Sequence, residues 1–566
     1  MNDLRISWAV FFIVLAGASV FTLIGSWLVL WRYRRSVARA MRASGWAAGP
    51  QQAAESPIAP AVTAAASAPA TTSADGERER AQRLFSRAVH APWVELACIG
   101  AGGVAYAIVL ASAFLLANEA ARTPLRFALT LWVDAWPIVI AAALVGPGFV
   151  RSAALGSALY AALFALGTLA AIAVPQPAAE SVDAVLLALR DTVTPAMMVR
   201  FWLIFAAVPT AVLLLFLNPS LRAVSPLLLT FTTIAIVVVV AAWVAIFAAP
   251  SREFIVRLAG STAGGWAGWL ALGGSIVLGL VAAVGAGWLA LRAIRNAYLA
   301  KSISDRTLVI DALWLFFAGF FSMQFVLEGQ AWLLSGVFAF AAYRVVLGVA
   351  RSGVRRRESP MAPRGLVFLR VFALGPKSSA LFDALAKHWR RVGSLQLITG
   401  PDLAQSTAQP HQLLDFVSGR LASHFIGDAG TLEARLDGVD RAADRDGWHR
   451  INNFFCRADT WQAVLARMVR EGDVVLMDLR SFTPVNSGCV HELRHLAEFV
   501  PLGRCVFVVD ATTDQAHFRS VLREALARAG ATSPNRGATA ESVTVHPWVA
   551  GPKGLRGLLQ RLCHAA

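Results

Sequence analysis

The sequence predicts an α-helical polytopic membrane domain followed by a C-terminal α/β domain built on a parallel sheet. The chain of 566 residues is 57% hydrophobic and only 15% charged, whereas a soluble globular chain carries roughly 25% charged residues. Apolar runs of about 20 residues, the length that crosses a bilayer as a helix, recur up to residue 350. From Arg364 onward, short apolar runs alternate with amphipathic segments, a pattern typical of a parallel sheet covered by helices on both faces.

Nine apolar runs are candidate membrane helices. The first is followed at once by the basic stretch WRYRR, whereas a cleaved signal peptide carries its positive charge before a shorter apolar core. We therefore expect an uncleaved anchor helix within residues 1–42 and an eight-helix membrane domain at 91–352. The nine runs span about 7–31, 93–118, 127–149, 152–174, 200–218, 225–249, 266–291, 308–327 and 330–350.

Residues 43–90 join the anchor to the membrane domain. The stretch 47–75 is rich in Ala, Pro, Ser and Thr and has few large apolar side chains. Such a stretch cannot bury enough surface to fold, so we expect a disordered linker. The segment GERERAQRLFSRAV follows at 76–89, and its pattern predicts a short amphipathic helix on the membrane surface.

The net charge of +16 is best explained by membrane orientation. Most of the basic excess flanks apolar runs, and basic residues hold the flanking loops on the cytoplasmic side. The basic clusters after the first, seventh and ninth runs predict a multi-pass protein of the bacterial inner (plasma) membrane. They place the N-terminus outside and the C-terminal domain in the cytoplasm. The bilayer is therefore an expected partner and nucleic acid is not.

Two acidic residues, Asp134 and Asp311, lie closest to the expected bilayer interior. Acids inside a membrane are candidates for ion pathways. Both lie within about three turns of a predicted helix end, where water and headgroups reach, so we favour a solvated position over an ion path.

The C-terminal domain, at 365–566, is expected to bind ligands at one edge of its sheet. Strands are predicted at 365–374, 394–400, 473–482, 503–514 and 542–548. Ligands of parallel sheets bind at the carboxyl ends of the strands. The residues expected to contact a nucleotide there are Gly375, Ser378, Ser379, Asp402, Asp478 and Ser481.

The segment 473–496 carries a resemblance to a known family. The strand DVVLMDL, the loop RSFTPVNSG and the helix CVHELRHL together resemble a TIR domain, a fold of the flavodoxin-like class. The whole chain is similar to bacterial multi-pass membrane proteins with a TIR-like cytoplasmic domain. In TIR domains that cleave NAD, the acid of the helix is the catalytic glutamate, and the resemblance assigns that role to Glu492. The chain departs from the pattern in a polar stretch of about 55 residues before residue 460 and in Gly488, which replaces the usual tryptophan.

The chemistry of NAD cleavage gives Glu492 a plausible function. Breaking the nicotinamide bond builds positive charge on the ribose, and a carboxylate against the sugar stabilises that charge. The alternative is an ordinary surface glutamate.

His491, Glu492 and His495 also match the zinc motif H-E-x-x-H. Arg494 inside the motif and Pro501, at the position where the extended form of the motif has a third histidine, argue against a metal. We therefore expect no metal.

Three functions are compatible with this pattern. The first is a membrane-held hydrolase of NAD or a related nucleotide, with NAD as substrate and with no cofactor required. The second is a non-catalytic signalling or scaffolding module that self-associates. The third is a transporter with a regulatory tail. Fold class alone does not decide among them.

Overall fold

A computed structural model describes most of the helical and α/β regions of the chain. The described residues are 20, 24–25, 27–40, 74–117, 124–146, 149–173, 199–200, 202–216, 230, 232–234, 253, 257, 266–322, 330–357, 361–371, 376–399, 416, 425–426, 429–456 and 460–566. The chain divides into two compact units. The helical unit comprises Met1–Trp31 and Trp93–Glu358, and the α/β unit comprises Arg32–Pro92 and Ser359–Ala566.

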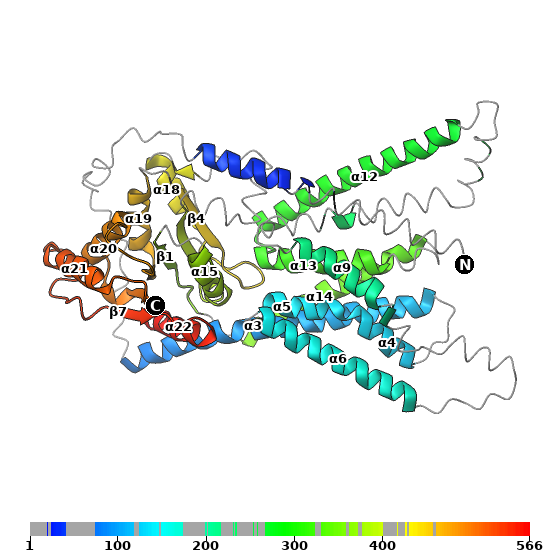
Figure 1. The fold of residues 1–566 in the computed structure, drawn as a ribbon, viewed down its shortest axis with the longest axis horizontal. Coiled ribbons are helices and arrows are strands. Elements are labelled where there is room, and N and C mark those ends of the chain that lie inside the picture. The colour runs from blue at the N-terminus through cyan, green and yellow to red at the C-terminus, as the bar shows by residue number, and fades with distance from the viewer. Residues whose placement is uncertain are drawn as a thin grey trace. The chain divides into compact units, whose positions relative to one another are not determined.

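The helical unit is an array of apolar helices (Figure 1). Its core is formed mainly by α3, α5, α13 and α14, where Tyr106, Trp314 and Tyr343 pack ring against ring. The elements are α3 (Ala74–Ala117, from Trp93 onward), α4 (Pro124–Asp134), α5 (Trp136–Val145), α6 (Phe149–Ala173), η1 (Leu203–Ala207), α9 (Val208–Phe216), α12 (Trp266–Leu299), α13 (Asp305–Ser322), η3 (Gln330–Leu333) and α14 (Leu334–Arg357).

Close contact between α13 and α14 depends on a glycine. A Cβ atom on Gly336 would lie 2.4 Å from the carbonyl oxygen of Ala318, so only glycine fits at this crossing. Small residues of this kind let apolar helices approach closely where no water drives them together. The predicted run at 330–350 thus forms a packed helix rather than an isolated span.

Among the described residues, four helical segments are long and apolar enough to cross a membrane: Asp75–Ala117, Arg126–Val145, Val277–Leu299 and Ala331–Arg357. They overlap the predicted spans at 93–118, 127–149, 266–291 and 330–350. The predicted spans at 152–174, 200–218 and 308–327 coincide with helices that do not meet these criteria. The remaining two, at 7–31 and 225–249, fall largely outside the described residues.

The α/β unit contains a parallel sheet of seven strands in the order β3-β4-β2-β1-β5-β6-β7. The strands are β1 (Leu366–Arg370), β2 (Leu395–Thr399), β3 (Phe425–Ile426), β4 (Ile451–Cys456), β5 (Val474–Asp478), β6 (Cys505–Val509) and β7 (Thr544–Pro547). The five predicted strands correspond to β1, β2, β5, β6 and β7. The strands β3 and β4 were not predicted, because they come from the polar stretch before residue 460.

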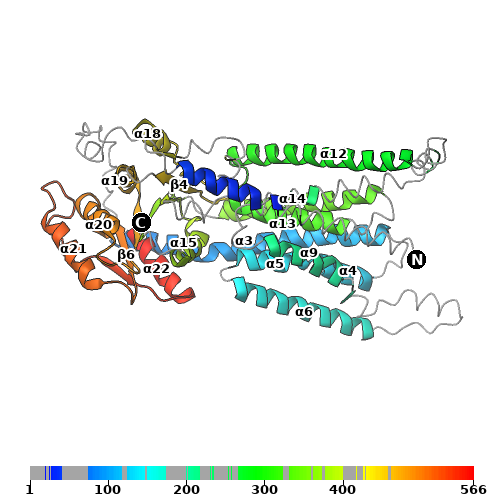
Figure 2. The same cartoon turned by 45° about the horizontal axis from the view of Figure 1, so that its top comes forward.

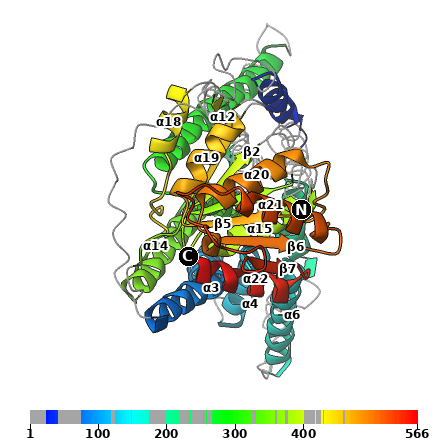
Figure 3. The ribbon, with the colours of Figure 1, turned by 90° about the vertical axis from the view of Figure 1, so that its left-hand side faces the viewer.

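Helices cover both faces of this sheet, as Figures 2 and 3 show for α20 on one side and α22 on the other. One apolar core includes α18 (Ala429–Asp437), α19 (Trp461–Glu471), α20 (Ser487–Phe499) and α21 (Gln515–Ala527). The core of the opposite face includes α15 (Pro376–Trp389) and α22 (Pro552–Ala565).

The first part of α3 also belongs to the α/β unit. Leu84 and Ala88 are fully buried in the same core as α15 and α22, and the backbone oxygen of Ala88 lies 2.9 Å from Nδ1 of His388. The amphipathic segment expected on the membrane surface therefore has a protein partner for its apolar face. Pro92 lies inside α3 where the two units divide.

Candidate ligand site at the switch point of the sheet

The strand order creates a switch point between β1 and β5. The chain continues from β1 to β2 on one side and returns to β5 on the other. In open parallel sheets, ligands bind at such a point, outside the carboxyl ends of the strands. The last residues of the two strands, Arg370 and Asp478, are partners in the register, and both are buried. These two side chains therefore mark the floor of the candidate site.

The Asp478 carboxylate is held by the guanidinium of Arg480. Nε of Arg480 donates to Oδ1 at 2.8 Å, and Nη2 donates to Oδ2 at 2.7 Å. Charge-assisted bidentate pairs of this kind fix orientation as well as neutralise charge. The guanidinium carbon also lies 5.5 Å from the ring centre of Trp548. Asp478, expected to contact a nucleotide, therefore positions Arg480 at the edge of the site.

Ser481 follows with a left-handed backbone, at φ 57°. Its N–H donates to Oγ1 of Thr512 at 3.0 Å, and the two hydroxyls are also 3.0 Å apart. Thr512 in turn donates to Oδ1 of Asp510 at 2.6 Å. Burial alone would raise the pKa of Asp510, but the hydrogen bonds from Thr512 and the charge of Arg480 lower it. The loops after β5 and β6 are thus joined by a polar network at the carboxyl edge.

Glu492 lies on α20 and faces the sheet. Its exposed fraction is 1%, and Oε2 has no hydrogen-bond partner within the described part of the chain. Burial raises the pKa of Glu492 to about 8, although the charge of Arg370 acts in the opposite direction. At neutral pH the group is therefore mostly an uncharged acid. The alternative expected from the sequence, a charged glutamate on the surface, does not hold.

Helical spacing explains why this glutamate is buried. Cys489, Glu492, Leu493 and Leu496 lie on one face of α20 and are all buried, as the i, i+3, i+4, i+7 pattern requires. The thiol of Cys489 lies 3.8 Å from the backbone oxygen of Arg370. Burial raises the pKa of Cys489, so it remains a thiol. The side chains of residues 489 and 492 thus meet the floor of the site.

The start of α20 differs in detail from an ordinary capped helix. Asn486 occupies the N-cap position, but its side chain makes no bond to the helix. Oδ1 of Asn486 instead accepts from the backbone N–H of Thr483 at 2.8 Å and from its hydroxyl at 3.0 Å. The asparagine therefore holds the turn that precedes α20 and, through it, the direction of the helix axis.

The phosphate-binding residues expected after β1 and β2 are only partly described. Ser378, in the first turn of α15, is buried, and its hydroxyl has no partner among the described residues. Ser379 is half-buried in the same turn. Gly375 and Asp402 lie outside the described residues.

The two histidines of the H-E-x-x-H pattern lie together on a different part of α20. Their ring centres are 6.4 Å apart, with His491 against Trp461 and His495 against Phe499. Burial lowers the pKa of His495 to about 4, and the charges of its neighbours add to this effect. In the described part of the chain, no group of three or more His, Cys, Asp or Glu side chains is placed to hold a metal ion.

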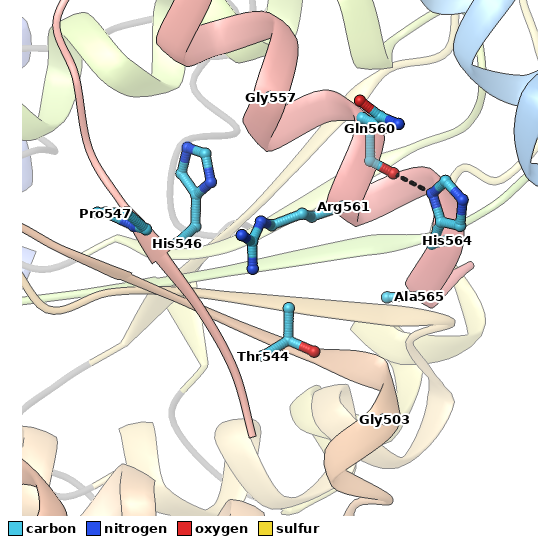
Figure 4. Close-up of a pocket in the computed structure, with 9 residues that line it drawn as sticks. All are labelled: Gly503, Thr544, His546, Pro547, Gly557, Gln560, Arg561, His564 and Ala565. Atoms are coloured by element: carbon cyan, nitrogen blue, oxygen red, sulfur yellow. Dashed lines mark hydrogen bonds between the residues drawn. The ribbon is translucent and has the colours of Figure 1, made fainter. Parts of the chain in front are cut away.

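A separate pocket of about 610 Å³ lies at the sheet edge between β7 and α22 (Figure 4). Arg561 crosses it and donates to the backbone oxygen of Val545 at 2.8 Å. Together with Pro547, which has no N–H, this contact blunts the outer edge of β7. The residues that line the pocket are Gly503, Thr544, His546, Pro547, Gly557, Gln560, Arg561, His564 and Ala565. None of them belongs to the site at the switch point.

Sequence reasoning missed Arg370 and this edge pocket. Arg370 is the one charged side chain in the apolar run GLVFLRVFAL. A single charge inside such a run is the signal by which the sequence could have identified it.

Comparison of the chain with protein-family models, curated proteins and solved structures finds no match.

Proposed function

We propose that the protein is a membrane-anchored hydrolase whose α/β unit is TIR-like and cleaves NAD or a related dinucleotide. The observation that carries this proposal is the buried carboxyl group of Glu492 at the switch point, whose Oε2 has no hydrogen-bond partner among the described residues. The strand order supports the fold assignment, because β2-β1-β5-β6-β7 follows the flavodoxin-like order 2-1-3-4-5, with β4 and β3 added at one edge. The location is the inner membrane, with the α/β unit in the cytoplasm.

Burial gives Glu492 the property that such a reaction needs. A carboxyl group with a pKa of about 8 is mostly uncharged at neutral pH, because the charge of Arg370 only partly offsets the effect of burial. A substrate that brings a pyridinium cation beside it favours the ionised form, because an opposite charge at short range stabilises the carboxylate. The binding energy of the cationic substrate thus charges the group only when the substrate is present.

The reaction is a hydrolysis at the anomeric carbon of the ribose. The bond from C1′ to the nicotinamide nitrogen breaks, and its electron pair leaves with neutral nicotinamide. The carboxylate of Glu492 stabilises the positive charge that develops on the sugar. Water then adds to C1′ and gives up a proton, which the carboxylate accepts as a general base. The products are nicotinamide and the nucleoside diphosphate sugar.

The experiment measures nicotinamide release by the full chain in detergent, incubated with NAD at high protein concentration. The full chain is required because Leu84 and Ala88, far from the C-terminal segment in the sequence, complete the core of the α/β unit. Glu492→Gln keeps the shape and removes the acid, and we expect release to fall by about 100-fold or more.

Glu498→Gln is the matched control, because Glu498 lies on the same helix but binds the backbone N–H of Gly530. It should retain the wild-type rate. Undiminished release by Glu492→Gln, or no release by the wild type even when it is clustered on vesicles, would refute the hydrolase.

The second candidate is a non-catalytic signalling module that self-associates through the α/β unit. One observation favours it: Val485, in the loop that follows β5, is 86% exposed. In this second function, Val485 packs against the α/β unit of another copy when the protein associates. A wild type without turnover but with concentration-dependent association that Val485→Ser removes would favour this function.

A further inference from the structure

The membrane-length segment Arg126–Val145 is broken near its middle. The helix α4 ends at Asp134 and α5 begins at Trp136, so the break falls at Ala135, the tenth of the 20 residues of the segment. Across the break, the backbone N–H of Ala135 bonds to Leu131, but the N–H of Ile138 bonds to Ala135, three residues back. Pro137 has no N–H, so the carbonyl of Val133 lacks its regular helical donor. Interrupted helices of this kind occur where transporters hold ions.

An unpaired acid lies at this break. Asp134 has an exposed fraction of 0%, and neither of its carboxylate oxygens has a hydrogen-bond partner among the described residues. Tyr106, on α3, lies close enough to Asp134 to interact with it electrostatically. Its hydroxyl is also buried and has no partner in the same described part of the chain. The two carboxylate oxygens of Asp134 and the hydroxyl of Tyr106 are thus three buried oxygens without a hydrogen-bond partner among the described residues.

Two other acids of the helical core, Asp311 and Glu95, are paired with arginines, which distinguishes them from Asp134. Asp311 forms an ion pair with Arg344, and Glu95 forms one with Arg351. Both arginines belong to α14 and are already engaged. A buried carboxylate without a partner is costly, so its retention at a helix break indicates that something else supplies the positive charge.

We propose that Asp134 and Tyr106 bind a monovalent alkali cation, such as Na⁺ or K⁺, inside the helical unit. Oxygen atoms are the ligands that hard cations prefer. A single positive charge matches the single carboxylate, whereas a divalent ion would leave a net charge in the apolar core. The aromatic frame around the break holds the site in place. Trp132 donates from Nε1 to the backbone oxygen of Tyr160 at 2.8 Å, and Trp136 donates to Oγ1 of Thr210 at 2.7 Å.

The test is equilibrium binding of radioactive ²²Na⁺ and ⁸⁶Rb⁺ to the purified full chain in detergent at pH 8. We expect saturable binding of one of these ions and its loss in Asp134→Asn, which keeps the size of the side chain. Tyr106→Phe removes one ligand and should weaken binding about tenfold, the effect of losing one hydrogen-bond-strength contact. Asp311→Asn, which alters a paired acid of the same unit, should bind as the wild type does.

The competing occupant is a proton, which would leave Asp134 as a neutral acid. In that case the fluorescence of Trp132 and Trp136 would change with pH, and neither ion would bind; this result overturns the proposal. Saturable binding that survives in Asp134→Asn overturns it as well. A thermal unfolding midpoint of Asp134→Asn at or above that of the wild type establishes that lost binding is not lost folding.

Discussion

Burial controls the charge of two residues on α20 in opposite senses. It raises the pKa of Glu492 to about 8 and lowers the pKa of His495 to about 4, because a low-dielectric environment disfavours the charged form of either group. Near neutral pH both side chains are therefore largely uncharged. The proposed chemistry uses this state, because at neutral pH a cationic substrate beside Glu492 shifts the group toward its charged form.

The stability of the α/β unit should depend on pH through the ionisation of Glu492. The folded protein holds this proton more tightly than the unfolded chain, whose glutamate titrates near 4.5. The free energy of unfolding should therefore fall as the pH rises from about 4.5 to about 8, by roughly 1 kcal/mol per pH unit. Glu492→Gln lacks this loss, so its stability relative to the wild type should increase over the same range.

Hydrogen-exchange protection of the β5 amides in the full chain measures this difference, because β5 is a fully buried central strand. Comparison of variant and wild type at each pH removes the effects of other groups, including His495. If the difference in β5 protection between Glu492→Gln and the wild type is the same at pH 5 and pH 8, the burial of Glu492 is contradicted.

Single residues show where sequence reasoning succeeds and where it stops. The sequence left two alternatives open for Glu492, a group that faces the cleft and an ordinary surface glutamate, and the structure buries its side chain. The bidentate bond from Arg480 to Asp478 does not follow from spacing, because the two residues are two apart along the chain and only the turn after β5 lets their side chains meet. The burial of Arg370 depends on strands from distant parts of the sequence.

The helix α3 is the element that the sequence predicted least well. Its first part has an amphipathic pattern that suits either a membrane surface or a protein surface, and periodicity does not distinguish these two partners. The structure places Leu84 and Ala88 in the sheet core. In the same way, β4 was missed because INNFFC carries two asparagines after its first residue and lies at the end of a polar stretch, although its burial pattern is that of a strand covered on both faces.

We predict that Leu84→Ala destabilises the α/β unit by about 3 kcal/mol, the usual effect of emptying a buried leucine site. The change should appear as faster hydrogen exchange in β1, whose Leu366 and Phe368 belong to the same core as Leu84. Gln82→Ala, on the exposed side of the same helix, serves as the control. If hydrogen exchange in β1 is unchanged in Leu84→Ala, the first part of α3 does not stabilise the sheet core, and the prediction that it lies on the membrane surface stands.

At the scale of the whole molecule, the α/β unit is discontinuous in sequence. Segments from 32–92 and 359–566 form one compact unit, and the helical unit is encoded largely between them. The core of the α/β unit therefore contains residues from both segments, Leu84 and Ala88 among them. Composition and hydropathy predicted the two classes of structure and their order, but this joining of distant segments depends on tertiary packing that no local pattern records.

The most direct test of the central claim is the pH dependence of kcat/KM for nicotinamide release by the full chain. This parameter reports the ionisation of essential groups in the free enzyme. If the carboxylate of Glu492 is the catalytic form, kcat/KM should rise about tenfold per pH unit below pH 8 and level off above it. A rate that stays constant from pH 6 to pH 9, or that falls above pH 8, would contradict this account.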